Sequence, residues 1–198
     1  VFFDRIVDGL DAPKVTTDDY NCGIKATEHL IENGCKQIAF LSISQHLSIS
    51  NKRMEGYLEA LYRNNIPPNN ALIVACDRDE AKNNELIQEL LKRENRPDGI
   101  FASVEKLAIS TYKICEELQL NIPKDVKVIT FSNSYTAAFL NPSLTTVTQP
   151  AYEMGREAAA ILFKLIEKKK HHSAPESIVL NSRLIVGNST KGERNMES

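Results

Sequence analysis

The stretch DVKVITFSNSYTAAFLNPSLTTVTQP, from Asp125 to Pro150, decides how the chain folds. It contains two apolar, β-branched runs, Val126 to Phe131 and Leu144 to Val147, which we predict to be buried strands. In open α/β sheets, ligands bind beyond the carboxyl ends of the strands, so the first run predicts a binding site at Ser132-Asn133. The second run then carries the chain to another part of the molecule. We therefore interpret the stretch as a hinge segment between two lobes that hold a small molecule.

Strand-like and helix-like segments alternate along the rest of the chain. The predicted strands are 1–3, 14–17, 38–41, 71–75, 100–102 and 177–186. The predicted helices, recognised by apolar residues at helical spacing, are 20–33, 51–64, 80–93, 105–118 and 151–168. This alternation is typical of mostly parallel sheets with helices on both faces. It predicts an α/β fold of two Rossmann-like wound lobes with a ligand cleft between them.

The same pattern predicts how the chain is divided between the lobes. We expect residues 1–43 and 149–172 to form an incomplete first lobe, and residues 44–148 and 173–190 to form the second. Residues 191–198 are polar and are expected to form a loose tail.

Composition excludes several classes of protein. With a formal net charge of −2 and no stripe of basic residues, the chain is not expected to bind nucleic acid by itself. No stretch approaches the roughly 18 apolar residues of a membrane span, so no membrane partner is expected. The four cysteines are scattered without C-x-x-C or metal-ligand spacing, which favours buried thiols in a reducing, cytoplasmic compartment and predicts neither metal nor cofactor. The start at Val1, without Met, suggests a fragment.

Six strings, in this order and at these spacings, resemble the effector-binding domain of the LacI/GalR family of bacterial transcription regulators. They are VFFDR (1–5), VTTDDYNCGIKATEHLIENGCKQIAFL (15–41), LSISNKRMEGYLEAL (47–61), RPDGIFAS (96–103), IPKDVKVITFSN (122–133) and NPSLTTVTQPAYEMGREAAAIL (141–162). The last string is the most specific. The resemblance implies a type I periplasmic-binding-protein-like fold, a sugar-like effector between the lobes, a homodimer, and DNA binding only through a separate amino-terminal domain that this sequence lacks.

The resemblance also implies a set of effector-binding residues. They are Asp4, Arg53, Arg78, Glu105, Ser132 and Gln149. Arg78 stands where many members of the family carry an aromatic ring, and Ser132 where several carry a carboxylate. Val104, beside Glu105, stands where sugar-binding members often carry Asn. These departures remove polar anchors for a neutral sugar and add a cation, which favours an acidic sugar or an oligosaccharide fragment.

Each of these residues also has a purely structural interpretation. Arg53 and Arg78 could pair with Asp4, Asp77 or Asp79, Gln149 could bridge backbone at the hinge, and capping explains Asp18-Asp19. If Arg53 is a ligand contact, Arg53→Ala should abolish ligand-induced stabilisation and leave the melting temperature of the free protein within a few degrees.

Three functions compete at this point. The first is ligand-gated control of transcription, with the apolar segment 135–140 either at a dimer interface or folded onto its own lobe. The second is an extracytoplasmic sugar-binding protein of a transporter, which shares the fold. The third is an enzyme, which we do not expect because the glycines form no phosphate-binding pattern and no G-x-S-x-G is present.

Overall fold

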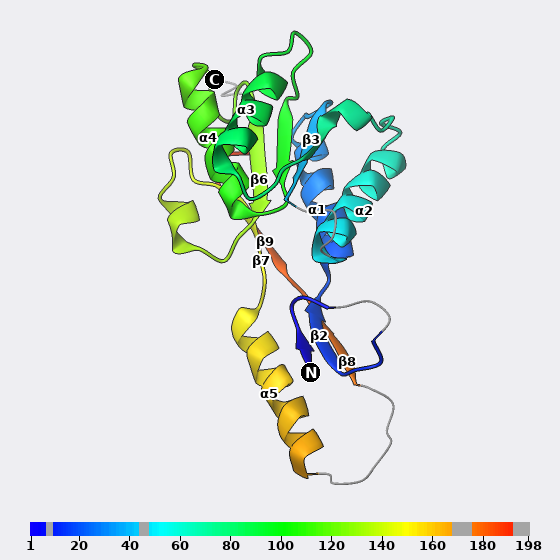
Figure 1. Cartoon of the computed structure of the whole chain (residues 1–198). Coiled ribbons are helices and arrows are strands. Elements are labelled where there is room, and N and C mark those ends of the chain that lie inside the picture. Colours follow the sequence, from blue (N-terminus) through cyan, green and yellow to red (C-terminus); the bar gives the residue numbers. More distant parts are fainter. Residues whose placement is uncertain (7–9, 44–47, 168–175, 192–198) are drawn as a thin grey trace, which may run out of the picture.

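The computed structural model describes residues 1–6, 10–43, 48–167 and 176–191, and it divides them between two sheets (Figure 1). The larger sheet has six strands in the order β4-β3-β5-β6-β7-β9, and the smaller has three in the order β1-β2-β8. All strand pairs are parallel except β7 with β9. The predicted α/β fold with two wound, mostly parallel lobes is therefore confirmed.

The larger sheet lies between two helix pairs. Its strands are β3 (Ile38–Ser42), β4 (Ile73–Ala75), β5 (Gly99–Ala102), β6 (Lys127–Phe131), β7 (Thr145–Thr148) and β9 (Arg183–Ile185). Helices α1 (Asp19–Glu32) and α2 (Ser48–Arg63) cover one face, and α3 (Glu80–Leu91) and α4 (Glu105–Glu117) cover the other. The short 3-10 turns η1 (Asn70–Leu72) and η2 (Tyr135–Ala138) lie in the connections.

Side chains of each central strand alternate between these two helical layers. In β3, Ile38 and Phe40 pack with α1 and α2, whereas Ala39 and Leu41 pack with α3 and α4. All four are buried, because a parallel sheet with both faces covered has no solvent side. This explains why the strand reads as a continuous apolar run in the sequence.

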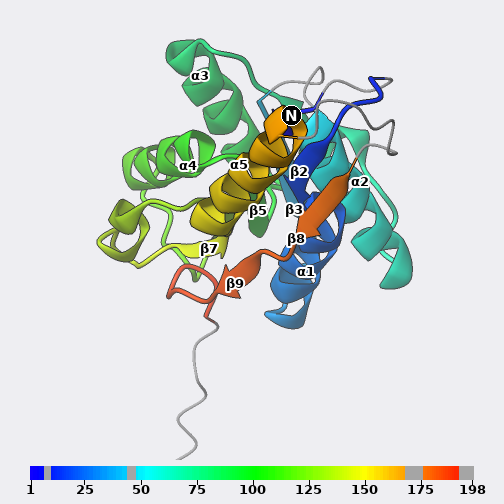
Figure 2. The same cartoon turned by 90° about the horizontal axis from the view of Figure 1, so that it is seen from below.

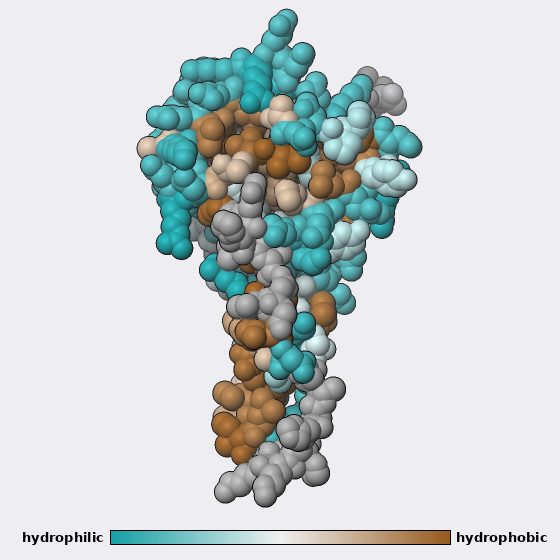
Figure 3. Space-filling view, turned by 45° about the vertical axis from the view of Figure 1, so that its right-hand side comes forward, coloured by the Kyte–Doolittle hydropathy of each residue, from teal (hydrophilic) through white to brown (hydrophobic). Residues whose placement is uncertain are grey.

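The smaller sheet carries a single described helix. Its strands are β1 (Phe2–Phe3), β2 (Lys14–Thr17) and β8 (Ser177–Leu180), and α5 (Ala151–Glu167) packs on them through Met154 and Ile161 (Figure 2). The other side of α5 is apolar and exposed, with Phe163 and Ile166 each 62% accessible (Figure 3). Within the described ranges, no helix has the length and apolar character needed to cross a bilayer.

The predicted division of the chain between the lobes is wrong at two boundaries. Helix α1 and strand β3 belong to the larger sheet, so the chain first crosses between sheets at Thr17-Asp18 and not after residue 43. The last crossing falls at Asn181-Ser182, between β8 and β9, and not at residue 173. The crossing at Gln149-Pro150 lies where it was predicted.

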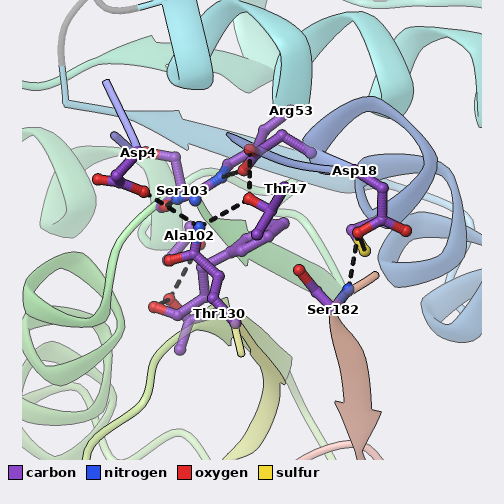
Figure 4. A network of polar contacts seen from close by, with 12 residues as sticks. Asp4, Thr17, Asp18, Arg53, Ala102, Ser103, Thr130 and Ser182 are labelled. Carbon is purple, nitrogen blue, oxygen red and sulfur yellow. Dashed lines mark hydrogen bonds and ion pairs between the residues drawn. The ribbon is translucent and has the colours of Figure 1, made fainter. Parts of the chain in front are cut away.

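Hydrogen bonds join the three crossings to one another and to the larger sheet. The buried Asp18 carboxylate accepts from the Ser182 backbone N–H at 2.8 Å (Figure 4). The amide of Asn133 exchanges two hydrogen bonds with the backbone of Gln149, at 2.9 and 2.7 Å. Asp18, which directly precedes α1, therefore holds a neighbouring crossing with its carboxylate and does not cap the helix as the sequence suggested.

Candidate functional site

A cavity of about 570 Å³ opens at the carboxyl ends of β3, β4 and β5. Its wall is formed by the residues that follow these strands, by the first turns of α2 and by one residue beyond β1: Ile43, Asp77, Arg78, Ser103, Val104, Lys106, Ile49, Ser50, Arg53 and Arg5. Arg5 belongs to the smaller sheet and the remainder to the larger lobe. The cavity is therefore bounded by both lobes, at the strand ends where open α/β sheets bind ligands.

Arg53 lies at the inner end of this cavity and is almost fully buried. Its Nε donates to Asp19 Oδ1 at 2.7 Å, and its Nη1 donates to the carbonyl oxygen of Ser103 at 2.6 Å. The guanidinium carbon lies 3.6 Å from the centroid of the Phe131 ring. These contacts fix the orientation of the guanidinium and leave its other N–H groups for the cavity.

Two glycines bring α1 and α2 close enough for this ion pair. A Cβ on Gly23 would lie 2.5 Å from the backbone oxygen of Arg53, and a Cβ on Gly56 would collide with the backbone oxygen of Tyr20. The helices thus cross backbone to backbone, which places Asp19 beside Arg53 although 34 positions separate them. The helix crossing is the local reason for the site geometry.

A chain of hydrogen bonds leads from Arg53 back to the smaller sheet. Asp19 Oδ2 accepts from Thr17 Oγ1 at 2.8 Å, and that hydroxyl accepts from Gln149 Nε2 at 2.9 Å. The same Gln149 nitrogen lies 3.3 Å from Asp4 Oδ1. Asp4, Gln149 and Arg53, predicted separately, are therefore parts of one polar network that spans the crossings.

Asp4 occupies a strained backbone conformation with φ of +60°. The Arg5 N–H donates to the Phe3 carbonyl oxygen at 2.6 Å, which makes Asp4 the centre of a tight three-residue turn. Asp4 lines a second cavity of about 430 Å³ that also includes Asp19, whereas Arg5 lines the first. Backbone strain of this kind, at residues other than glycine, is concentrated at functional sites.

Arg78 lines the first cavity but is exposed, and the acids predicted to pair with it are engaged elsewhere. Asp77 forms an ion pair with Lys82 at 3.1 Å, and the Asp79 carboxylate accepts from the backbone N–H groups of Ala81 and Lys82. Those bonds cap α3. Arg78 is thus a cation available to the cavity.

Of the six predicted residues, only Arg53 and Arg78 line this cavity, so Glu105 and Ser132 lie outside its wall, as do Asp4 and Gln149. Glu105 Oε1 accepts from Thr136 Oγ1 at 3.1 Å and lines a shallow depression on the outer side of α4. Ser132 is buried, and its Oγ accepts from the Ser134 backbone N–H at 2.9 Å. In this conformation, both side chains stabilise the connection around η2.

Sequence reasoning missed Asp19, Thr17 and Ser103. Asp19 was interpreted as a cap, although the real signal was the pair of glycines that predicts close helix packing. Ser103 supplies a backbone acceptor to Arg53, and its own hydroxyl is buried without a hydrogen-bond partner in the described part of the chain. Ser103 directly follows β5, but its importance depends on Arg53 of α2, which the local sequence does not indicate.

The cysteines offer no nucleophile to the site. All four are free and buried. Burial raises the thiol pKa to about 12 for Cys22, Cys35 and Cys115, and to about 11 for Cys76. No group of three or more metal-ligating side chains occurs within the described ranges. The site is therefore built for hydrogen bonding and charge, with arginine as its main donor.

Comparison with known proteins identifies the family. The model of the periplasmic binding protein-like domain matches residues 27–190, most of the chain. The chain belongs to this family. Its relatives include transcriptional repressors and LacI-family regulators, and the resemblance to LacI-family effector-binding domains is thereby confirmed.

Two relatives and one solved structure illustrate the extent of the similarity. The chain is 29% identical to the HTH-type transcriptional repressor PurR of Actinobacillus pleuropneumoniae serotype 3 (strain JL03), over 90% of this chain and 53% of the repressor. It is 32% identical to catabolite control protein A of Priestia megaterium, over 79% and 48%. The complex of the transcriptional regulator CelR with cellobiose matches with a TM-score of 0.83 and 28% identity, over 90% and 54%. The chain thus spans about half the length of the curated relatives it matches.

Proposed function

We propose that this chain is the ligand-sensing part of a LacI-type transcription regulator, and that a small sugar-like effector binds in the cavity between its lobes. The observation that carries this proposal is the composition of the cavity wall. Arg5 comes from the smaller sheet, whereas Arg53 and Arg78 come from the larger lobe. A ligand that contacts all three is sensitive to the relative position of the two lobes.

The proposed mechanism is a shift between open and closed arrangements of the lobes. A ligand changes such an equilibrium only by its differential affinity for the two states. Three crossings connect the lobes, and the hydrogen bonds of Gln149 to Thr17 and Asp4 link the first two of them. Bound effector would favour one set of these hydrogen bonds, and the lobe movement would reach DNA through a separate DNA-binding domain.

Homodimerisation is part of the same proposal. Tyr135 and Phe139, on and directly after η2, are 90% and 86% exposed, and Ile109 on α4 is 46% exposed. Ala137, in contrast, is buried and Leu140 packs on the core. The segment that the sequence left open between an interface and its own lobe thus presents two aromatic rings outward, which suits a second copy of the chain.

The other two functions receive less support. The named relatives are a transcriptional repressor and a catabolite control protein, which disfavours a transporter's binding protein and supports a cytoplasmic regulator. The raised thiol pKa values and the arginine-lined wall also fit a binding site better than a catalytic one. Sites of the proposed kind need neither metal nor cofactor.

A binding experiment with a cavity-filling variant tests the proposal. The full chain would be titrated with a panel of neutral and acidic sugars, cellobiose included, and followed by calorimetry and thermal shift. At least one sugar should raise the melting temperature by mass action. Val104→Trp, in the cavity wall, should abolish that rise, whereas Lys113→Trp, exposed further along α4, should retain it. No response to any sugar, or equal responses in both variants, would contradict the proposal.

A further inference from the structure

The charges of the cavity wall do not cancel. Five ionisable residues line it, and three of them are paired within the protein. Arg53 pairs with Asp19 at 2.7 Å, and Asp77 pairs with Lys82 at 3.1 Å. Lys106 pairs with Glu80 at 3.3 Å.

The two ionisable residues of the wall that remain are Arg5 and Arg78. Both are exposed, and neither forms an ion pair in the part of the chain that the structure describes. The cavity therefore carries excess positive charge contributed by both lobes.

Two helix amino termini reinforce this positive potential. Ile49 and Ser50, in the first turn of α2, line the cavity, and that turn contains no acidic side chain. Val104, the residue that caps α4, also lines the cavity and provides no side-chain hydrogen bond to the helix. Free N–H groups and the helix dipole make such termini favourable for anions. The helix amino termini and the arginines thus both favour an anionic ligand.

The inner wall contains an unused hydrogen-bonding group. Ser103 is 1% exposed and lines the cavity, and its Oγ has no hydrogen-bond partner among the residues that the structure describes. A buried hydroxyl without a partner is costly and is normally satisfied by the protein or by a bound molecule. No described residue in the wall is aromatic, and the nearby Phe131 ring is covered by Arg53. The described part of the wall thus offers a ligand charge and hydrogen bonds but no exposed aromatic ring.

We infer that the effector is anionic: a sugar or polyol that carries a carboxylate or phosphate group, held by Arg78 and Arg5. This inference rests on the proposed function. The charge of Arg53 is offset by Asp19, so Arg53 acts as a hydrogen-bond donor to neutral hydroxyl groups. Arg78 and Arg5 keep their full charge for the anionic group, and their planar guanidinium groups match the oxygens of a carboxylate or a phosphate.

The test compares charged and neutral forms of one sugar. Calorimetry on the full chain would use D-glucose, D-glucuronate and D-glucose 6-phosphate, with inorganic phosphate as a simple anion. We expect at least one of the two anionic sugars, glucuronate or glucose 6-phosphate, to bind roughly tenfold or more tightly than glucose. Its affinity should fall as salt is added. The two acids distinguish a carboxylate from a phosphate. Glucose binding as tightly as both acids would overturn the inference and leave the proposed function standing.

Charge-neutral variants assign the effect to the arginines. Arg78→Gln should weaken binding of the preferred acid by about tenfold, and adding Arg5→Gln should weaken it further. Arg63→Gln, at the far end of α2 where Arg63 pairs with Glu59, removes the same charge away from the cavity and should have little effect. Equal losses in Arg63→Gln and Arg78→Gln, or inorganic phosphate binding as tightly as the sugar acids, would overturn the assignment. If the unmodified chain bound none of the sugars, the proposed function would be overturned as well.

Discussion

At the scale of single residues, the ion pair between Arg53 and Asp19 is both structural and functional. Each side chain is about 5% exposed or less, so removing one partner leaves a buried charge uncompensated. The expectation that Arg53→Ala would leave the free protein nearly unchanged must therefore be revised. Sequence reasoning identified Arg53 through the family but proposed Asp4, Asp77 or Asp79 as its partner. The true partner depends on how two helices pack, which local sequence does not specify.

Asp19→Ala should lower the free energy of unfolding by about 3–5 kcal/mol, because it leaves the Arg53 guanidinium buried beside Phe131 without its counter-charge. Denaturant unfolding of the free protein measures this. Glu85→Ala, an exposed acid on α3, serves as the control and should change stability by less than about 0.5 kcal/mol. Similar values for the two variants would show that the ion pair contributes little.

His29 predicts a dependence of stability on pH. Its Nε2 lies 2.8 Å from Thr190 Oγ1, and burial lowers its pKa below the ordinary value of 6.5. The unfolded chain therefore binds a proton before the folded chain does as pH falls. The contribution of His29 is fully present above pH 6.5 and is lost as pH falls through the lowered, folded-state pKa.

Chemical denaturation should consequently show that the free energy of unfolding decreases as the pH is lowered from 7.5 to 5. In the His29→Gln variant this decrease should be smaller. The side-chain amide retains a hydrogen-bonding group near Thr190 but does not titrate. An equally steep decline in the variant would assign the pH dependence to other groups.

At the scale of elements, the sequence predicted the helices and most of the strands but not their assignment to sheets. The single strand predicted at 177–186 is two strands, β8 and β9, which belong to different sheets. Periodicity identified β3 and α1 because a doubly covered strand is continuously apolar and a surface helix is amphipathic. It could not show that the first crossing lies at Thr17-Asp18, because two short polar residues look like an ordinary turn. The crossing at Gln149-Pro150 was predictable because Pro150 and the family string mark it.

The close packing of α1 against α2 gives a prediction with an internal control. Alanine normally stabilises a helix relative to glycine by about 1 kcal/mol. At Gly23 and Gly56 the added methyl group would meet backbone, so each Gly→Ala substitution should instead destabilise by about 1–3 kcal/mol. Gly155→Ala, in α5 with no atom within 4 Å of the added group, should stabilise the protein. Melting curves of the three variants would contradict this packing if all shifted in the same direction.

At the scale of the whole molecule, two exposed apolar surfaces are candidates for contact with a second copy. One contains Tyr135 and Phe139 beside α4, and the other contains Phe163 and Ile166 on α5. The first belongs to the larger lobe and the second to the smaller one. We favour the first, because its aromatic rings project from an otherwise well-packed lobe.

Tyr135→Ser combined with Phe139→Ser should shift the chain from dimer to monomer in light scattering coupled to size exclusion. Phe163→Ser with Ile166→Ser provides the comparison and should leave the dimer unchanged. Dissociation by the second pair alone, or a wild-type chain that is monomeric at all concentrations, would contradict the proposed interface.

The most direct test of an effector held between the lobes is hydrogen–deuterium exchange with and without the tightest-binding sugar of the panel. We expect slower exchange in segments of both lobes that line the cavity, 1–6 from the smaller sheet and 101–106 and 49–54 from the larger lobe. The crossing at Gln149-Pro150 should change with them, because Gln149 is bonded to Thr17 and lies near Asp4. Protection confined to one lobe, with the crossing unaffected, would contradict binding between the lobes.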